Sequence, residues 1–286
     1  MEVSKLKNIV IVILVLLNLF LLILSGGRRV QDVRNREQAR HAAVEVIKNG
    51  GVKLDEQIVP AKMELAPRTA ERDLKAELLQ ARALLGDEVD MQAKGGEVYR
   101  YTGDAGWLQV HSTGQYSAHL TGEPPLAENE RAQERAVALL ARMDVESRVV
   151  ESRREDGQEV ILLQQTLDGA PLLDCQATVT YTQQGEWSVS GGRRLLGQAE
   201  QTGGDPITVA TALMRLYNGL NDMGDVYNAI TGITQAYSIS SEGTGTMRLT
   251  PVWQVETDTG TYRLDTLTGG LTRTGDPARQ ATEPVE

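Results

Sequence analysis

The sequence predicts an α+β protein in which an N-terminal transmembrane helix precedes a body of repeated helix plus antiparallel-sheet units. Three features predict this class: one long apolar run near the N-terminus, apolar residues at helical spacing in later segments, and apolar–polar alternation between those segments, separated by glycine turns. The chain has 286 residues, of which 41% are hydrophobic, so it can bury a sizeable core.

The apolar run extends from Ile9 to Leu24 and is interrupted only by Asn18. Its sixteen residues would span about 24 Å as a helix, so flanking residues must complete a bilayer crossing, and we expect a transmembrane helix over residues 8–25. A cleaved signal peptide is the alternative. The run is longer than the usual apolar core of a signal peptide and no A-x-A site follows it, which favours a retained anchor.

The predicted orientation places residues 1–7 in the cytoplasm and the body outside the cell membrane. More Lys and Arg follow the run than precede it, and this charge count argues for the opposite orientation. A large globular domain translocates largely regardless of such charges, and the N-terminal tail is too short to hold a function alone. We therefore expect the body to be extracytoplasmic.

Asn18 is the candidate partner-binding residue. An amide inside the hydrocarbon is costly to leave unpaired, so a neighbouring helix that offers a hydrogen bond would be favoured. The alternative is that Asn18 bonds the backbone of its own helix. The first reading predicts a helix–helix interface within the bilayer.

Helix-capping and turn residues mark the first elements that are predicted after the anchor. Residues 37–48 carry apolar side chains at helical spacing and end at Asn49-Gly50, a good helix C-terminus. Residues 52–59 suit a strand or an extended connection. Pro67 opens the next predicted helix, whose apolar face continues to Leu85 and which Gly86 ends.

Period-two alternation over residues 97–121 predicts a β-meander with glycine-containing turns. Residues 126–143 return to helical spacing, entered through Pro124-Pro125. A second sheet region, residues 160–189, turns at Asp168-Gly169 and again at Gln184-Gly185.

The last helix is predicted to start at Asp205, with Pro206 in its first position, and to end at Asn218-Gly219. Residues 247–273 alternate again and form the closing strands. Helix followed by antiparallel sheet thus recurs about three times, which points to two similar lobes. We expect a first lobe with the membrane-proximal helix over residues 26–123, a second lobe over residues 124–275, and a disordered tail over residues 276–286.

Charge and residue usage exclude several functions. The net charge of −10 disfavours nucleic acid as a partner, and the single cysteine, Cys175, makes an intrachain disulfide impossible. Cys175 is expected to be a buried, inert thiol. Of the three histidines, His41 lies on the membrane-proximal helix; His111 and His119 are expected to be solvated strand residues, although they could face each other across a hairpin.

No motif for nucleotide, metal or nucleophilic chemistry is present. The glycine pairs lie at strand ends, where turns are expected. Two pairs of carboxylates, Asp87 with Asp90 and Asp222 with Asp225, lie in polar segments and are expected to be solvated. We therefore predict no catalytic residue, no metal ligand and no cofactor, and a protein that is not an enzyme.

The opening residues, E-V-S-K-L-K-N-I-V-I-V-I-L-V-L-L-N-L-F-L-L from Glu2 to Leu22, resemble the start of the YycI family. The resemblance continues through Gln164 to Pro171, the helix after Asp205-Pro206, and P-V-W-Q-V-E-T-D-T-G-T-Y-R-L-D-T-L-T-G-G from Pro251 to Gly270. That last hairpin also resembles the closing strands of PepSY modules, which are small non-catalytic domains. Val3 departs from the pattern, because the family has Trp there.

The resemblance implies a membrane-anchored adaptor that regulates a two-component sensor histidine kinase of cell-wall homeostasis. Its partners would be the kinase, a second related anchored regulator and the lipid bilayer, with contacts through the transmembrane helix and the outer domain; Asn18 matches the family's intramembrane Asn. The alternative is a tethered PepSY-like module that binds a ligand or inhibits a protease. A third class of function, a cell-wall enzyme, would need a polar cleft, and no motif in the sequence indicates one.

Overall fold

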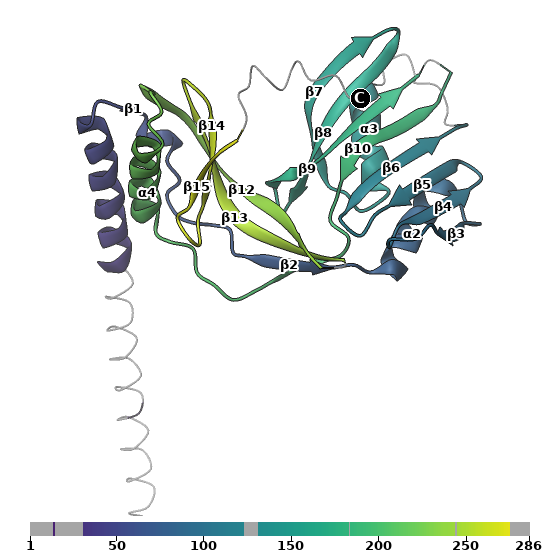
Figure 1. The fold of residues 1–286 in the computed structure, drawn as a ribbon, viewed down its shortest axis with the longest axis horizontal. Coiled ribbons are helices and arrows are strands. Elements are labelled where there is room, and N and C mark those ends of the chain that lie inside the picture. Colours follow the sequence, from purple (N-terminus) through teal and green to yellow (C-terminus); the bar gives the residue numbers. More distant parts are fainter. Residues whose placement is uncertain (1–13, 15–30, 123–130, 183, 244, 275–286) are drawn as a thin grey trace, which may run out of the picture.

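The computed structural model describes residue 14 and residues 31–122, 131–182, 184–243 and 245–274. They form a mixed α+β fold that is mostly antiparallel sheet (Figure 1). Within these residues, no helix has both the length and the apolar character needed to cross a membrane. The predicted anchor, apart from Leu14, and the predicted C-terminal tail lie outside the described part of the chain.

The helices carry local caps that set where they begin and end. The side chain of Asp73 accepts hydrogen bonds from the backbone N–H groups of Lys75 and Ala76, and Gly86 ends the same helix with a φ of 106°. The side chain of Thr208 accepts from the N–H of Thr211 in the same way. The helices are residues 31–49, α2 (Leu74–Leu85), α3 (Ala132–Ala141) and α4 (Val209–Asp222), with a short 3-10 turn, η1 (Glu56–Ile58).

Two predicted helix starts are wrong. Pro67 precedes a strand, because residues 68–71 pair with neighbouring strands and the helix starts only after Asp73. Asp205 does not cap the last helix, because Thr208 does, so that Pro206 lies before the helix. The predicted stop at Gly219 is also early, since α4 continues to Asp222.

The strands account for most of the body. They are β1 (Lys53–Leu54), β2 (Arg68–Glu71), β3 (Asp90–Ala93), β4 (Tyr99–Gly103), β5 (Gly106–Val110), β6 (Gln115–Leu120), β7 (Ser147–Glu155), β8 (Gln158–Leu167), β9 (Ala170–Tyr181), β10 (Trp187–Arg193), β11 (Ala199–Gln201), β12 (Ala229–Glu242), β13 (Thr246–Thr257), β14 (Thr261–Asp265) and β15 (Leu271–Thr274). The predicted meander is present as β4, β5 and β6, whereas β3, β7 and β12 were not expected from the sequence.

The described strands form one continuous 15-stranded sheet with two parts, which we name the first and the second sheet. The first sheet contains β1, β2 and β11–β15, and the second contains β3–β10. They meet where β9 runs parallel to β12 with a single paired position, Leu172 opposite Tyr237. Figure 1 shows the first sheet with helix 31–49 and α4 at one end of the molecule, and the second sheet with α2 and α3 at the other.

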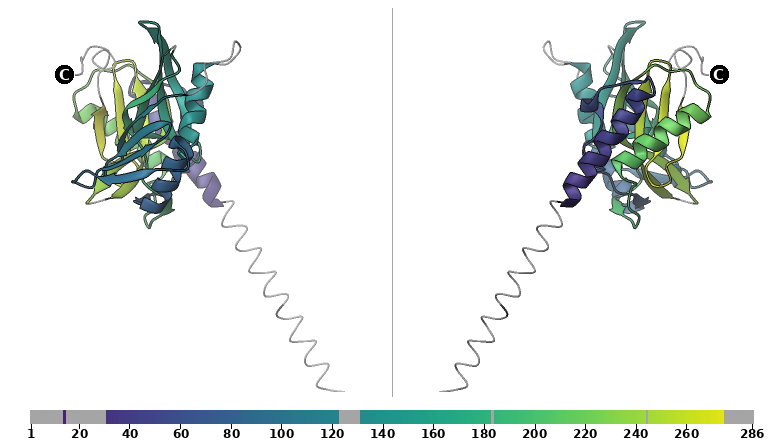
Figure 2. Two further views of the ribbon diagram at one scale, coloured as in Figure 1. Left: turned by 90° about the vertical axis from the view of Figure 1, so that its right-hand side faces the viewer. Right: turned by 90° about the vertical axis from the view of Figure 1, so that its left-hand side faces the viewer.

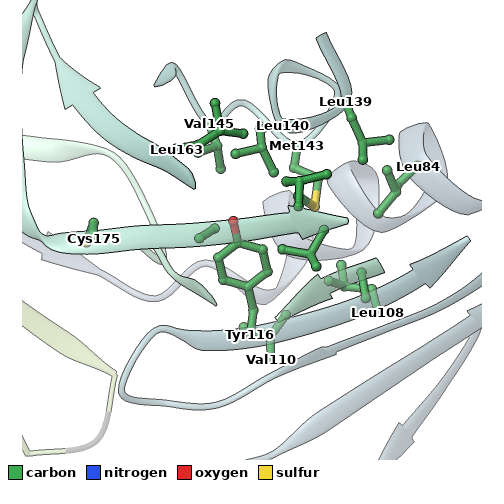
Figure 3. Close-up of a cluster of buried hydrophobic side chains, with 14 of the residues drawn as sticks. Leu84, Leu108, Val110, Tyr116, Leu139, Leu140, Met143, Val145, Leu163 and Cys175 are labelled. Atoms are coloured by element: carbon green, nitrogen blue, oxygen red, sulfur yellow. The ribbon is translucent and has the colours of Figure 1, made fainter. Parts of the chain in front are cut away.

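Two clusters of buried side chains form the core. Cluster 1 packs α2 and α3 on the second sheet and includes Leu84, Tyr116 and Leu140 (Figure 3). Cluster 2 packs helix 31–49 and α4 on the first sheet and includes Trp253 and Tyr262. Each cluster takes side chains from both sides of the boundary predicted between residues 123 and 124.

A group of charged and phenolic side chains lies buried beside cluster 1. The guanidinium of Arg72 donates to both carboxylate oxygens of Glu77, at 2.8 and 2.9 Å, and the hydroxyl of Tyr101 donates to the same carboxylate at 2.7 Å. Arg194 is also fully buried; burial lowers the pKa of its guanidinium, and the negative charge of Glu77 opposes that shift. Glu77 therefore pairs directly with Arg72, and its charge also stabilises the buried cation of Arg194.

Replacing Glu77 by Ala should destabilise the protein by about 3–5 kcal/mol, because Arg72 and Arg194 would remain buried without a counter-charge. Urea denaturation of the purified chain measures this loss. Glu134→Ala is the matched control, since that side chain on α3 is 69% exposed and its removal should cost less than about 0.5 kcal/mol. Equal losses in the two variants would contradict the role given to Glu77.

Candidate functional site: the docked helix and the open sheet face

Helix 31–49 is attached to the body by its C-terminal half. Residues 31–39 are exposed on every side, whereas Ala43, Val44 and Ile47 are buried in cluster 2. Their spacing places the three on one helical face, so the helix is joined to the core through a defined side. The predicted end at Asn49-Gly50 is confirmed, and the helix begins earlier than predicted.

The end of this helix abuts α4. A Cβ atom on Gly50 would lie 2.1 Å from the hydroxyl oxygen of Tyr217, so a larger residue at position 50 would have to displace the tyrosine ring. Leu213, Leu216 and Leu220 of α4 belong to the same cluster as Ile47. Figure 2 shows the two helices side by side across one face of the first sheet.

A second contact lies half-way along the helix, at η1. Glu56 forms an ion pair with Arg40 at 3.1 Å and lies 3.3 Å from Nδ1 of His41. The side chain of Asp55 caps η1 by accepting from the N–H of Gln57 at 2.9 Å. A partly exposed pair contributes at most about 1 kcal/mol, so this contact orients the helix while cluster 2 supplies most of the attachment.

The opposite face of the second sheet, away from α2 and α3, is open and polar. Trp107 on β5 lies opposite Thr102 and His119 on the adjacent strands, and His119 in turn lies opposite Ser188. Directly opposite residues share a face, and the alternate residues on these strands are the buried members of cluster 1. Trp107 has the largest side chain of this row, and the guanidinium carbon of Arg100 lies 4.3 Å from the centroid of its ring.

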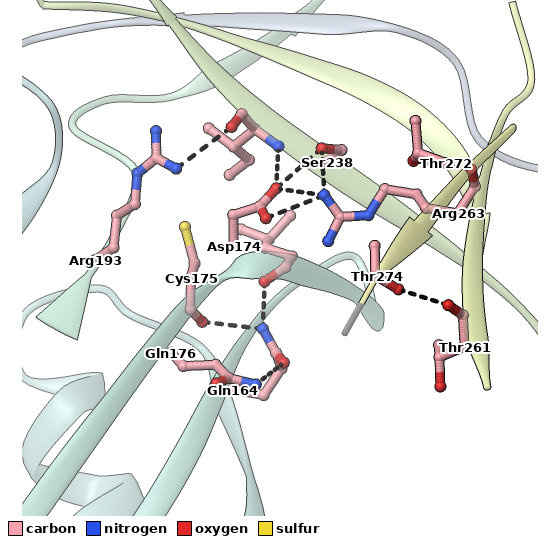
Figure 4. A network of polar contacts seen from close by, with 12 residues as sticks. Gln164, Asp174, Cys175, Gln176, Arg193, Ser238, Thr261, Arg263, Thr272 and Thr274 are labelled. Atoms are coloured by element: carbon pink, nitrogen blue, oxygen red, sulfur yellow. Dashed lines mark hydrogen bonds and ion pairs between the residues drawn. The ribbon is translucent and has the colours of Figure 1, made fainter. Parts of the chain in front are cut away.

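Asp174 joins this face to the polar face of the first sheet (Figure 4). Its carboxylate accepts from the hydroxyl of Ser238 at 2.9 Å and from the N–H of Ile239 at 2.8 Å, both on β12. Arg263 on β14 donates to the same carboxylate at 3.1 Å. Where β9 separates from β12, the backbone hydrogen bonds between the two strands end. The carboxylate of Asp174 there accepts a backbone N–H of β12 in place of a carbonyl group of β9.

Asn18, the predicted partner-binding residue, lies outside the described residues, so its role stays a prediction. His111 and His119 do not face each other: His119 is opposite Trp107, and Nε2 of His111 lies 3.3 Å from the side-chain nitrogen of Gln109. Asp225 is not simply solvated, because it accepts from the hydroxyl of Tyr262 at 2.7 Å and pairs with Arg273.

Cys175 is buried as predicted, and burial raises the pKa of its thiol to about 12. A thiol with such a pKa is protonated at neutral pH and is a poor nucleophile. In the part of the chain that the structure describes, no three His, Cys, Asp or Glu side chains are placed to hold a metal ion.

The docked helix, the capping of η1 and the role of Asp174 were not predicted. Ala43, Val44 and Ile47 could be read as an apolar stripe, but their partners on α4 are more than 160 residues away in the sequence. Asp174 stands just before the predicted alternation of β9, and no sequence signal marks it as a bridge between sheets.

No family model matches the chain, and no curated protein sequence matches it. Among solved structures, an uncharacterized protein from Eubacterium rectale is similar with 10% identity and a TM-score of 0.41, over 75% of this chain and 87% of that one. The C-terminal domain of Bacillus megaterium YpeB is similar with 12% identity and a TM-score of 0.36, over 72% of this chain and 100% of that one. With TM-scores this low, neither structure assigns a fold or a function to this chain.

Ile47→Ala should lower the free energy of unfolding by about 2–4 kcal/mol, because it leaves a cavity where helix 31–49 meets α4. Val46→Ala, one residue away and 46% exposed, should change it by less than about 0.5 kcal/mol. Denaturant titration of both variants measures the difference. Similar small effects would mean that this face does not attach the helix.

Stability should fall as pH rises from 9 toward 12, because the unfolded thiol of Cys175 ionises near its ordinary pKa of 9.0 while the folded thiol stays protonated. The raised pKa thus contributes stability below pH 9 that is lost above it. Relative to Cys175→Ala, the native chain should lose up to about 1.4 kcal/mol per pH unit in this range. The same change in the free energy of unfolding with pH in both proteins would contradict this.

Proposed function

We propose that this chain is a membrane-anchored adaptor, without catalytic activity of its own, that regulates a two-component sensor histidine kinase of cell-wall homeostasis. The observation that carries the proposal is the packing of Ala43, Val44 and Ile47 into cluster 2. An adaptor must transmit a conformational change between its anchor and its body. That requires a stiff connection at the point where the anchor meets the body.

The attachment of helix 31–49 supports such a connection on the side of the body. Six residues separate Leu24, the end of the apolar run, from Gln31, the first described residue of the helix. The helix then packs on the first sheet, whose strands β12 and β13 continue into cluster 1 through Tyr237 and Leu249. A tilt of the helix would therefore act on both clusters through one pair of long strands.

The resemblance to the YycI family names the partner class in this proposal, and the PepSY-like hairpin agrees with a non-catalytic body. Asn18 is the proposed contact inside the bilayer. A second related anchored regulator is a further proposed partner. The proposed location is the cell membrane, with the body outside the cytoplasm.

A tethered binding module is the second candidate function, and the open face of the second sheet favours it. Trp107, half-buried among Thr102, His119 and Ser188, is an aromatic side chain on an otherwise polar face. Such a face offers a ring for stacking and several hydroxyl groups for hydrogen bonds. In a tether, the helix only holds this face near the membrane.

Copurification from membranes with a sensor histidine kinase tests the adaptor directly. We expect the kinase to be recovered with the native chain and largely lost with Asn18→Leu, because the intramembrane amide would lose its hydrogen-bond partner. A chain whose apolar run is replaced by polyleucine should behave like Asn18→Leu. Equal recovery from all three chains would place the contact in the body, and no kinase in any of them would favour the tether.

Loosening the connection should abolish regulation without unfolding the body. We expect this result from six Gly and Ser residues inserted between Gln31 and Asp32, because a flexible segment cannot transmit a tilt. Kinase activity in membranes that contain both proteins is the measurement. The same insertion at the exposed turn Asp156-Gly157 is the control. Unchanged regulation with both insertions would support a tether.

A further inference from the structure

One row of side chains crosses the open face of the second sheet from strand to strand. Its members lie directly opposite one another on six neighbouring strands, β4, β5, β6, β10, β9 and β8 (Figure 1). They are Thr102, Trp107, His119, Ser188, Thr180 and Val160. Because neighbouring strands are about 4.8 Å apart, the row presents one side chain at each step of that length.

The row is electrically neutral at neutral pH apart from its histidine. Among the side chains that flank it on the same face, Gln109, Ser117 and Thr178 are uncharged, and Arg100 carries a charge. The other charged side chains of this face lie at the sheet edges, on β3 and β7, or at the junction with the first sheet; they are Asp90, Glu151, Arg153, Asp174 and Arg193. In a chain with 24% charged residues, such a row is complementary to an uncharged ligand.

The polar groups of the row are available to a ligand. Among the described residues, the hydroxyl groups of Ser188 and Thr180 and the ring nitrogens of His119 have no hydrogen-bond partner. The guanidinium of Arg100 has no acceptor in the described part of the chain either, and its contact is the ring of Trp107. The face thus combines one aromatic ring with hydroxyl groups and a guanidinium that can donate.

These features disfavour a protein or a nucleic acid as the ligand. A peptide that adds as a strand needs a free sheet edge, whereas β5, β6, β10 and β9 are paired on both sides. Protein interfaces are depleted in serine and enriched in several aromatic residues together. A nucleic acid would require several cations on the face, and Arg100 is one. A neutral polymer rich in hydroxyl groups fits the row better.

We propose that this row binds a polysaccharide strand that lies across β5, β6, β10 and β9. A sugar ring has C–H groups on its faces and hydroxyl groups around its edge, so one ring packs on Trp107 while others bond Ser188 and Thr180. A β-linked pyranose chain advances by nearly the distance between adjacent strands, so successive rings meet successive side chains. The inference names the ligand class for the binding module given above as the second candidate function, and it is independent of the adaptor proposal.

Tryptophan fluorescence of the purified full chain in detergent tests the contact, because Trp107 is half-buried while Trp187 and Trp253 are fully buried. Titration with chitohexaose or cellohexaose should give a saturable change in emission. Trp107→Ala should weaken binding, measured by calorimetry, on the order of tenfold, and Trp107→Tyr, which keeps a flat ring, by less than about threefold. Binding of both sugars would mean that rings and hydroxyl groups suffice, and binding of chitohexaose alone that the acetamido group takes part; either supports the inference.

Removal of hydroxyl groups supplies an independent measurement. Ser188→Ala with Thr180→Val keeps the shape of the row and should weaken binding about threefold to tenfold. Ser240→Ala with Thr231→Val makes the same change at exposed positions of β12 and should leave binding unchanged.

Three results would overturn the inference. They are no binding of either sugar by the native chain, undiminished binding by Trp107→Ala, and binding of a polyglutamate peptide in place of the sugars that is lost with Arg100→Ala. Because no kinase is present in these experiments, such a result would leave the adaptor proposal untouched. Failure to recover a kinase from membranes would likewise leave the polysaccharide contact standing.

Discussion

The antiparallel pairing of β12 with β13 is the constraint on which the rest of the structure depends. The two strands pair from Ile230 opposite Thr257 to Glu242 opposite Thr246; the first sheet is built outward from this hairpin, and the second sheet meets it where β9 pairs with β12. One end packs in cluster 2 through Trp253 and Val255, and the other packs in cluster 1. Separate folding of the two clusters would require this hairpin to be divided.

The sequence was informative where one face of an element is buried and its turns are short. The meander β4–β6 and the closing strands follow regular alternation, and glycine marks their turns. The longest strand, β12, was missed because its register shifts between Ile230 and Gly232, which breaks the alternation, and because Ser and Thr occupy its polar face. Strand β7 was missed because it is an exposed, charged edge.

The candidate site was less predictable because it depends on contacts between distant segments. Ala43 and Ile47 were expected on the apolar face of helix 31–49, but Val44 rather than the expected Val46 completes the buried face, and the partner helix, α4, was not predicted. The same holds for Asp174, whose acceptor role exists only because β9 and β12 diverge beside Arg263. Several residues near a helix start can act as its cap, and the sequence indicated Asp205-Pro206 where Thr208 caps α4 by accepting from the N–H of Thr211.

The fixed face of helix 31–49 also determines an angle. Because Ala43, Val44 and Ile47 hold the helix in one rotational setting, each preceding helical residue has a defined azimuth around the axis, advancing by about 100° per residue. Loss or gain of a single residue between Gln31 and Ala43 would turn the described helical residues before it by that amount relative to the body. The number of residues in this stretch therefore sets the direction in which the N-terminal end of the described helix presents its side chains.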